Sequence, residues 1–132
     1  MPGLAVSLTP KYDESLAHRI YAGSDALLMP SWFEPCGLGQ LIALRYGTLP
    51  IVRQTGGLAD TVQDADADPE GGTGFSFADY RPESLQDAIR RAVAAYADRP
   101  RWTGLMERAM AQDFSWEAST KKYEDLYRLC LQ

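Results

Sequence analysis

Short apolar segments alternate with segments of helical pattern through the first part of the chain. The apolar segments predict four strands, at residues 3–8, 26–29, 49–52 and 74–77. The helical patterns between them predict helices at residues 13–21, 38–46 and 58–62. Such alternation is typical of a parallel sheet, because each helix carries the chain back to the edge where the next strand begins. We therefore expect an α/β fold with a small parallel sheet.

The remainder of the chain, from about residue 82, has a helical pattern without a further strand. Pro82 suits the first turn of a helix, where its missing N–H is not needed. Apolar residues then recur at helical spacing, and Ser115 is a good cap for a last helix. Because no linker divides the chain, we expect one domain over residues 1–132, with a helical tail over about 82–132.

Charge and composition argue against several classes of partner. The formal net charge of -5 gives no electrostatic attraction to nucleic acid or to anionic lipid. No apolar run approaches the roughly 20 residues that span a bilayer, so we expect no membrane partner. The only cysteines, Cys36 and Cys130, are too far apart for a disulfide framework or a metal site. We therefore expect a reducing, cytoplasmic location and no metal.

One glycine-rich turn, Glu34-Pro35-Cys36-Gly37-Leu38-Gly39-Gln40, follows a predicted strand and opens a predicted helix. Ligands of open α/β sheets bind at the carboxyl ends of the strands. The first N–H groups of a helix are unpaired and attract anions, and Gly37 and Gly39 let a diphosphate approach them closely. Glu34 can accept hydrogen bonds from sugar hydroxyls. The alternative is that the glycines only shape a βα turn and that Glu34 is simply exposed.

A second glycine turn, Thr55-Gly56-Gly57, follows the strand at 49–52 and also precedes a helix. Two such turns can present two helix N-termini to one ligand, because the carboxyl ends of parallel strands meet at one edge of the sheet. Arg53 can add a cation to this site. The alternative is a tight turn with an arginine at the surface.

Two further side chains stand near the expected site. Tyr12 lies at the end of a predicted strand, where its ring can stack on a base, although a tyrosine in this place also serves for packing. Cys36 lies near a helix N-terminus, which lowers the pKa of a thiol, but no partner base for a nucleophile is apparent. A nucleophilic role for Cys36 is therefore not expected.

Several stretches of the sequence together resemble the donor site of one enzyme family. The stretches are Ala26–Leu38, Arg45–Arg53, Thr55–Val62 and Asp113–Trp116. They are similar to the donor-site signature of bacterial glycogen synthases and plant starch synthases. Tyr12 and His18-Arg19-Ile20 also stand where this family has them, so the resemblance covers nearly the whole chain.

The resemblance implies a fold and an activity. The family has the GT-B fold, in which two Rossmann-like domains face a cleft. It transfers glucose from ADP-glucose to the non-reducing end of an α-1,4-glucan, with retention of configuration and without a metal or other cofactor. This chain resembles only the later part of the second domain. Its Rossmann-like sheet is therefore expected to be half of a GT-B C-terminal domain.

The resemblance also implies roles for single residues. Glu34 is expected to be catalytic and to hold hydroxyls of the donor glucose, and Tyr12 is expected to stack on the adenine. The remaining donor-binding residues are expected to be Cys36, Gly37, Leu38, Gly39, Thr55, Gly56 and Gly57. Among them, the backbone of 37–39 is expected to face the diphosphate and Cys36 to lie beside the sugar.

The sequence departs from the wider pattern at two positions. Ile42 stands where related glycosyltransferases often have a second glutamate, although glycogen synthases commonly lack that glutamate too. Gly39 stands where some members have a hydroxyl residue that can touch phosphate. At Gly39 the phosphate contact would have to come from the backbone or from water.

The family segments that precede this chain carry the arginine and lysine that grip the diphosphate, and they carry the acceptor site. We therefore expect the chain alone to bind nucleotide weakly and to transfer no glucose. Its expected partners are a nucleotide sugar, an α-glucan, the missing N-terminal domain and a second copy bound through an exposed sheet edge. Two alternatives stay open: a non-catalytic module that binds nucleotide, glucan or protein, and another nucleotide-sugar transferase of the same fold.

Overall fold

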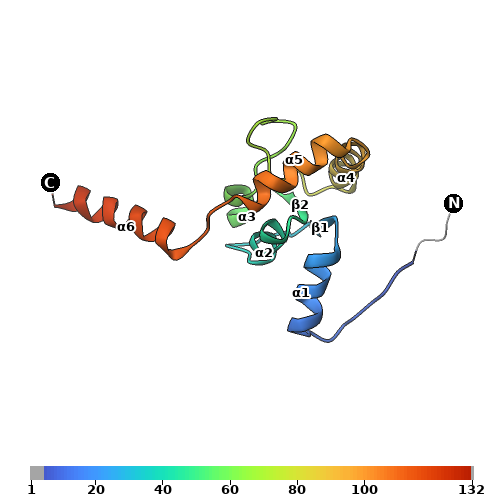
Figure 1. Ribbon diagram of the computed structural model, residues 1–132, viewed down its shortest axis with the longest axis horizontal. Coiled ribbons are helices and arrows are strands. Elements are labelled where there is room, and N and C mark those ends of the chain that lie inside the picture. Colours follow the sequence, from blue (N-terminus) through green and yellow to red (C-terminus); the bar gives the residue numbers. More distant parts are fainter. Residues whose placement is uncertain (1–4, 132) are drawn as a thin grey trace.

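The computed structural model describes residues 5–131 and contains a parallel sheet flanked by helices (Figure 1). The strands are β1 (Ala26–Met29), β2 (Leu49–Arg53) and β3 (Phe75–Phe77), in the order β1-β2-β3. The helices are α1 (Glu14–Gly23), α2 (Gly39–Tyr46), α3 (Gly56–Thr61), α4 (Pro82–Ala97), α5 (Arg99–Met110) and α6 (Trp116–Cys130). Both strand pairs are parallel, so the predicted α/β fold with a small parallel sheet is confirmed.

Local sequence signals explain where several helices begin and end. The Asp13 carboxylate accepts a hydrogen bond from the Leu16 amide at the start of α1, and the Ser115 hydroxyl accepts one from the Ala118 amide at the start of α6. Gly47 ends α2 in the left-handed conformation, with φ of 76°. These ends follow from side chains within one helical turn, which is why the sequence predicted them.

The strand predicted at residues 3–8 is not present as such. Residues 3 and 4 lie outside the described part, and residues 5–10 are extended without a strand partner among the described residues. Val6 and Leu8 are 81% and 86% exposed. An extended segment becomes a strand only when a neighbour satisfies its N–H and C=O groups. The prediction of four strands was therefore wrong, and the described sheet has three.

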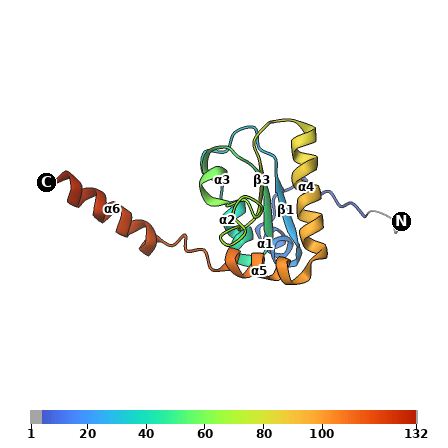
Figure 2. The same cartoon turned by 90° about the horizontal axis from the view of Figure 1, so that it is seen from above.

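The main core lies between the sheet and the helices α4 and α5. Phe75 of β3 stacks on Trp102 of α5 with ring centroids 6.3 Å apart, and Tyr96 meets Trp102 edge to face at 5.1 Å. Small side chains on one face of α4, including Ala88 and Ala92, let this helix lie close to the sheet. Figure 2 shows α4 running alongside the strands.

The strands of the sheet differ in how well their side chains are buried. β2 and β3 are buried almost throughout, as expected for parallel strands. In β1 the side chains alternate between exposed and half-buried, and Leu28 is 47% exposed. Among the described residues β1 and β3 each pair only with β2, so both are edge strands. The side chains of β3 are buried and those of β1 are not, so the β1 edge is the less covered of the two.

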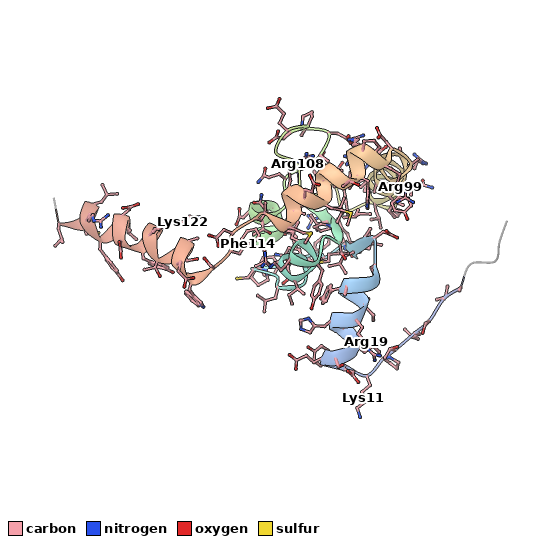
Figure 3. The ribbon with its side chains drawn as sticks, viewed as in Figure 1. Lys11, Arg19, Arg99, Arg108, Phe114 and Lys122 are labelled. Atoms are coloured by element: carbon pink, nitrogen blue, oxygen red, sulfur yellow. The ribbon has the colours of Figure 1, made fainter. Side chains whose placement is uncertain are left out.

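Of the helices expected to form a tail, α4 and α5 lie on the sheet and α6 extends away from it (Figures 1 and 2). No described residue of α6 is buried, and Trp116 and Tyr127 are 81% and 65% exposed. Phe114 lies where the chain leaves the body of the molecule (Figure 3) and lines a hollow together with Leu41 and Leu44. No helix within residues 5–131 combines the length and the apolar composition that a transmembrane span requires.

Candidate functional site

The two glycine-rich turns meet at the carboxyl edge of the sheet. The first turn follows β1, the second follows β2, and the two strands are parallel neighbours. The Gly57 amide donates to the carbonyl oxygens of Glu34 and Pro35, at 3.2 and 3.1 Å. The turns are thus joined backbone to backbone.

The close approach of the turns requires glycine in the second of them. Gly56 has φ of 46°, in the left-handed region that disfavours other residues. A Cβ at Gly56 would run into the carbonyl oxygen of Glu34, and a Cβ at Gly57 would run into that of Cys36. The first turn therefore occupies the space beside these glycines, which explains both residues without reference to a ligand.

The start of α2 is open to solvent. Leu38, the residue before the helix, is 71% exposed and supplies no side-chain hydrogen bond to the first amides. Cys36 is exposed, and Gly37 and Glu34 are half-buried. Uncapped amides at a helix start carry partial positive charge, so this turn is suited to an anion.

Behind this turn lies a buried polar side chain to which sequence analysis assigned no role. Gln40 is fully buried, and its Nε2 donates to the carbonyl oxygens of Cys36 and Gly37, both at 3.0 Å. The same nitrogen lies 3.2 Å from Oγ1 of Thr61, which in turn donates to the Gly57 carbonyl. Gln40 therefore ties the first turn to α3.

Arg53 joins the loops that follow all three strands. Its Nη1 donates to the Trp32 carbonyl at 2.7 Å, and its guanidinium carbon lies 5.8 Å from the Trp32 ring and 5.5 Å from the Tyr80 ring. Trp32 and Tyr80 also meet edge to face, with centroids 4.7 Å apart. The guanidinium that sequence analysis offered to a ligand is engaged with protein.

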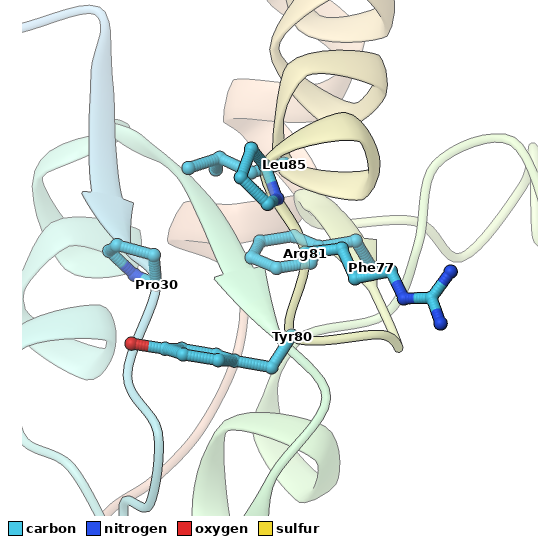
Figure 4. Close-up of a pocket in the computed structure, with 6 residues that line it drawn as sticks. Pro30, Phe77, Tyr80, Arg81 and Leu85 are labelled. Atoms are coloured by element: carbon cyan, nitrogen blue, oxygen red, sulfur yellow. The ribbon is translucent and has the colours of Figure 1, made fainter.

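A hollow of about 300 Å³ lies beside this cluster, where β1 and β3 end. Figure 4 shows Pro30, Tyr80 and Leu85 around it, with the guanidinium of Arg81 directed away. The sequence pattern did not predict this hollow. The signal that was available is the aromatic turn around Tyr80 directly after a predicted strand, since side chains at that place face the carboxyl edge.

Gln54, the residue before the second turn, is linked through Ser76 of β3 to the acidic loop after α3, at residues 63–74. Gln54 Nε2 donates to the Ser76 hydroxyl at 3.0 Å, and Asp64 accepts from the Ser76 amide at 2.7 Å. Arg91 lies 3.1 Å from Asp64 and 2.8 Å from Asp66. These ion pairs anchor the first part of the loop to α4.

Hydrogen bonds outweigh burial in setting the ionisation of this loop. Burial alone would raise the pKa of the Asp64 carboxyl, but bonds from the amides of Ser76 and Asp66 and from Arg91 hold that pKa below its usual value. A hydrogen bond from Arg91, opposed by burial and reinforced by Arg101, likewise lowers the pKa of Asp66. Both aspartates are therefore ionised at neutral pH.

Tyr12 is not brought to the glycine turns. It directly precedes Asp13, the cap of α1, and its side chain is 80% exposed. Among the described residues no hydrogen bond or ring contact joins Tyr12 to the loop that carries Glu34. The geometry at hand thus brings Glu34, Cys36 and the glycines together and leaves Tyr12 apart.

Residues 5–104 match the sequence pattern of the family Glycosyl transferases group 1. The chain belongs to this family. It is 57% identical over 126 residues to a glycogen synthase of Geotalea daltonii, which covers 96% of this chain and 26% of the relative. It is 60% identical over 117 residues to a glycogen synthase of Anaeromyxobacter dehalogenans, covering 89% and 24%. The predicted resemblance to glycogen synthases is thereby confirmed.

A solved structure agrees with these relatives. The catalytic domain of Starch Synthase IV from Arabidopsis thaliana, bound to ADP and acarbose, superposes with a TM-score of 0.82 at 48% identity. The match covers 89% of this chain and 25% of that one. The small sheet of this chain therefore matches part of the GT-B fold of the starch synthase, as predicted. The chain spans about a quarter of the length of the relatives it matches.

Proposed function

We propose that residues 1–132 form part of the donor-binding domain of a glycogen or starch synthase. The complete enzyme would transfer glucose from ADP-glucose to an α-1,4-glucan with retention of configuration. The observation that carries this proposal is the open start of α2 beside Glu34, held in place by the second glycine turn. The ADP in the solved starch synthase supports an adenine nucleotide as donor.

The proposed roles follow the geometry of the two turns. Glu34 acts in catalysis by holding hydroxyls of the donor glucose. The backbone at Gly37, Leu38 and Gly39 faces the diphosphate, and the leaving diphosphate is stabilised there electrostatically. The other proposed donor-binding residues in these turns are Cys36 beside the sugar and Thr55, Gly56 and Gly57 behind the first turn. Tyr12 lies apart from the turns, and its proposed place against the adenine rests on the family resemblance alone.

Further parts of the proposal concern partners and location. The rest of the synthase, including an N-terminal domain with the acceptor site, would supply the basic groups that grip the diphosphate. The uncovered edge of β1 supports association with other protein, either that remainder or a second copy. The exposed cysteines Cys36 and Cys130, which are not paired with each other, support a cytoplasmic location.

The isolated chain is expected to bind ADP more weakly than about 1 mM and to transfer no glucose. A helix start contributes about 0.3–1 kcal/mol to binding an anion at an exposed site. Millimolar binding already requires about 4 kcal/mol. Titration calorimetry of the 132-residue chain with ADP measures this affinity, and micromolar binding would contradict the expectation.

A hybrid enzyme tests the proposed activity itself. In the hybrid, this chain replaces the matched 126-residue segment of the Geotalea daltonii glycogen synthase. We expect the hybrid to transfer glucose from ADP-glucose to glycogen. Glu34→Gln should then lower kcat by about 100-fold or more, because a neutral amide replaces the carboxylate that accepts charge-assisted hydrogen bonds from the donor-glucose hydroxyls.

Glu70→Gln is the matched control, because Glu70 is an exposed glutamate of the acidic loop and should leave kcat unchanged. A hybrid that folds but transfers no glucose would refute the proposed function. Full activity in the Glu34→Gln hybrid would refute the role of that residue only.

A further inference from the structure

Gln40 is a buried polar side chain that is only partly satisfied by hydrogen bonds. The side chain is fully buried, and its Oε1 has no hydrogen-bond partner among the described residues. The amide cannot turn over to satisfy that oxygen, because Nε2 faces two carbonyl oxygens that only accept hydrogen bonds. An unsatisfied buried acceptor destabilises a protein. Packing alone therefore does not explain a glutamine here.

The two carbonyl groups bound by Gln40 fix the direction of two amides. The C=O of Cys36 and the N–H of Gly37 belong to one planar trans peptide unit and point in opposite directions. The same holds for the C=O of Gly37 and the N–H of Leu38. Because Gln40 draws both carbonyls toward the interior, both N–H groups face outward. Neither amide has a backbone hydrogen-bond partner among the described residues.

The position of Gly37 is fitted to this arrangement. Its φ of 71° is left-handed, and a Cβ there would collide with the Gln40 carboxamide. Thr61 holds the same carboxamide from α3, at 3.2 Å from Nε2 to Oγ1. Gln40 and Thr61 therefore set the direction of the two amides from the buried side of the turn. A ligand on the exposed side would not touch either side chain.

We propose that Gln40 is a positioning residue that directs the Gly37 and Leu38 amides toward the diphosphate of a nucleotide sugar. The inference rests on the proposed function, since it supposes that the outer face of the turn binds a diphosphate. Gln40 acts through the backbone and does not touch the ligand. Its loss should therefore weaken the binding of phosphate groups and leave other parts of the ligand unaffected.

The experiment compares ADP with adenosine in the full-length hybrid enzyme. Gln40→Met keeps the side-chain volume but removes the donor, and we expect it to weaken ADP binding by about tenfold to 100-fold. Adenosine, which lacks phosphate, should bind with unchanged affinity. The KM for ADP-glucose should rise while the KM for glycogen stays constant. Gln86→Met, at an exposed glutamine of α4, is the matched control and should change neither.

A second variant keeps the test informative if Gln40→Met does not fold. Thr61→Val keeps the shape of Thr61 but removes an acceptor from Gln40, so it should weaken ADP binding in the same direction and by less. Unchanged ADP affinity in both folded variants, or an equal loss of ADP and adenosine binding, would overturn the inference. If the unmodified hybrid neither binds ADP nor transfers glucose, the proposed function fails and the inference fails with it.

Discussion

At the scale of single residues, the backbone decides how the two turns approach each other. Gly57 donates to the carbonyls of Glu34 and Pro35, and the space that a side chain would need is filled by Cys36. The sequence predicted glycine turns at both places from local pattern. It did not predict their mutual contact, because Gly57 and Glu34 are distant in sequence and each turn is compatible with many neighbours.

Gly57→Ala is expected to destabilise the chain by more than about 2 kcal/mol, because the new Cβ collides with the Cys36 carbonyl and the turns must separate. Thermal unfolding measures the effect. Gly23→Ala is the matched control: a Cβ there meets no heavy atom within 4 Å among the described residues, so it should change stability by less than about 1 kcal/mol. Equal melting temperatures of the two variants would contradict the close contact.

Gln40 and Arg53 show a second limit at this scale. The residue types were visible in the sequence, but burial and hydrogen-bond partners depend on loops that meet only in the folded chain. The sequence left open whether Arg53 adds a cation to a ligand site or lies at the surface, and in the structure its guanidinium lies against Trp32 and Tyr80. A polar side chain near a predicted site can therefore bind the protein's own loops and not a ligand. Local sequence pattern does not distinguish these two possibilities.

At the scale of elements, the acidic loop is attached to α4 by charge. Asp64 and Asp66 have lowered pKa values in the folded chain, so their carboxylate forms stabilise it. That contribution is complete above their unfolded pKa of about 4 and is lost as the pH falls through the lower folded pKa. The chain should therefore lose stability progressively in acid.

Arg91→Leu tests this attachment. It should destabilise the chain at neutral pH by about 2 kcal/mol, because two carboxylates lose a charged hydrogen-bond partner. It should also flatten the decline of stability below pH 4 or so, which unfolding curves at several pH values would detect. Arg128→Leu is the control, since Arg128 forms only exposed pairs within α6. An unchanged acid decline in Arg91→Leu would contradict the assigned cause.

Most elements could be predicted because their signals are local. The strands at 26–29 and 49–52 are short apolar runs, and the helices carry caps and apolar faces within a few residues. The segment at 3–8 has the composition of a strand, but a strand also requires a paired neighbour, which pattern cannot supply. The cap and the apolar face of α6 predicted that helix. They did not predict where it lies, because the sequence of an apolar face does not identify the surface that covers it.

Deletion of residues 116–132 is expected to leave the melting temperature of the remaining chain within about 2 °C, because no described residue of α6 is buried. Scanning calorimetry of the shortened chain checks this. Trp102→Ala is the contrast, since Trp102 is 3% exposed and its loss should destabilise the chain by about 3–5 kcal/mol. A large drop in melting temperature on deletion would mean that α6 packs on the body.

At the scale of the whole molecule, the uncovered edge of β1 is the main unsatisfied surface of the sheet. Its backbone groups and the 47% exposed Leu28 offer a place for a further strand. The isolated chain should therefore self-associate at concentrations of roughly 100 µM, as measured by sedimentation velocity. Leu28→Lys should reduce the association by placing a charge at the edge.

Leu129→Lys is the control for that measurement, because Leu129 is 66% exposed on α6, away from the sheet. Equal loss of association in both variants would contradict a contact specific to the β1 edge. A chain that stays monomeric over this range would show that the edge is protected by other means.

The joined glycine turns have a consequence for how the chain can be divided. The direct contacts between them run from residues 34–40 to residues 57–61. A fragment that ends between these two stretches lacks one partner of each contact and loses the shape of the anion-facing loop. The smallest piece that carries the loop must therefore include both stretches.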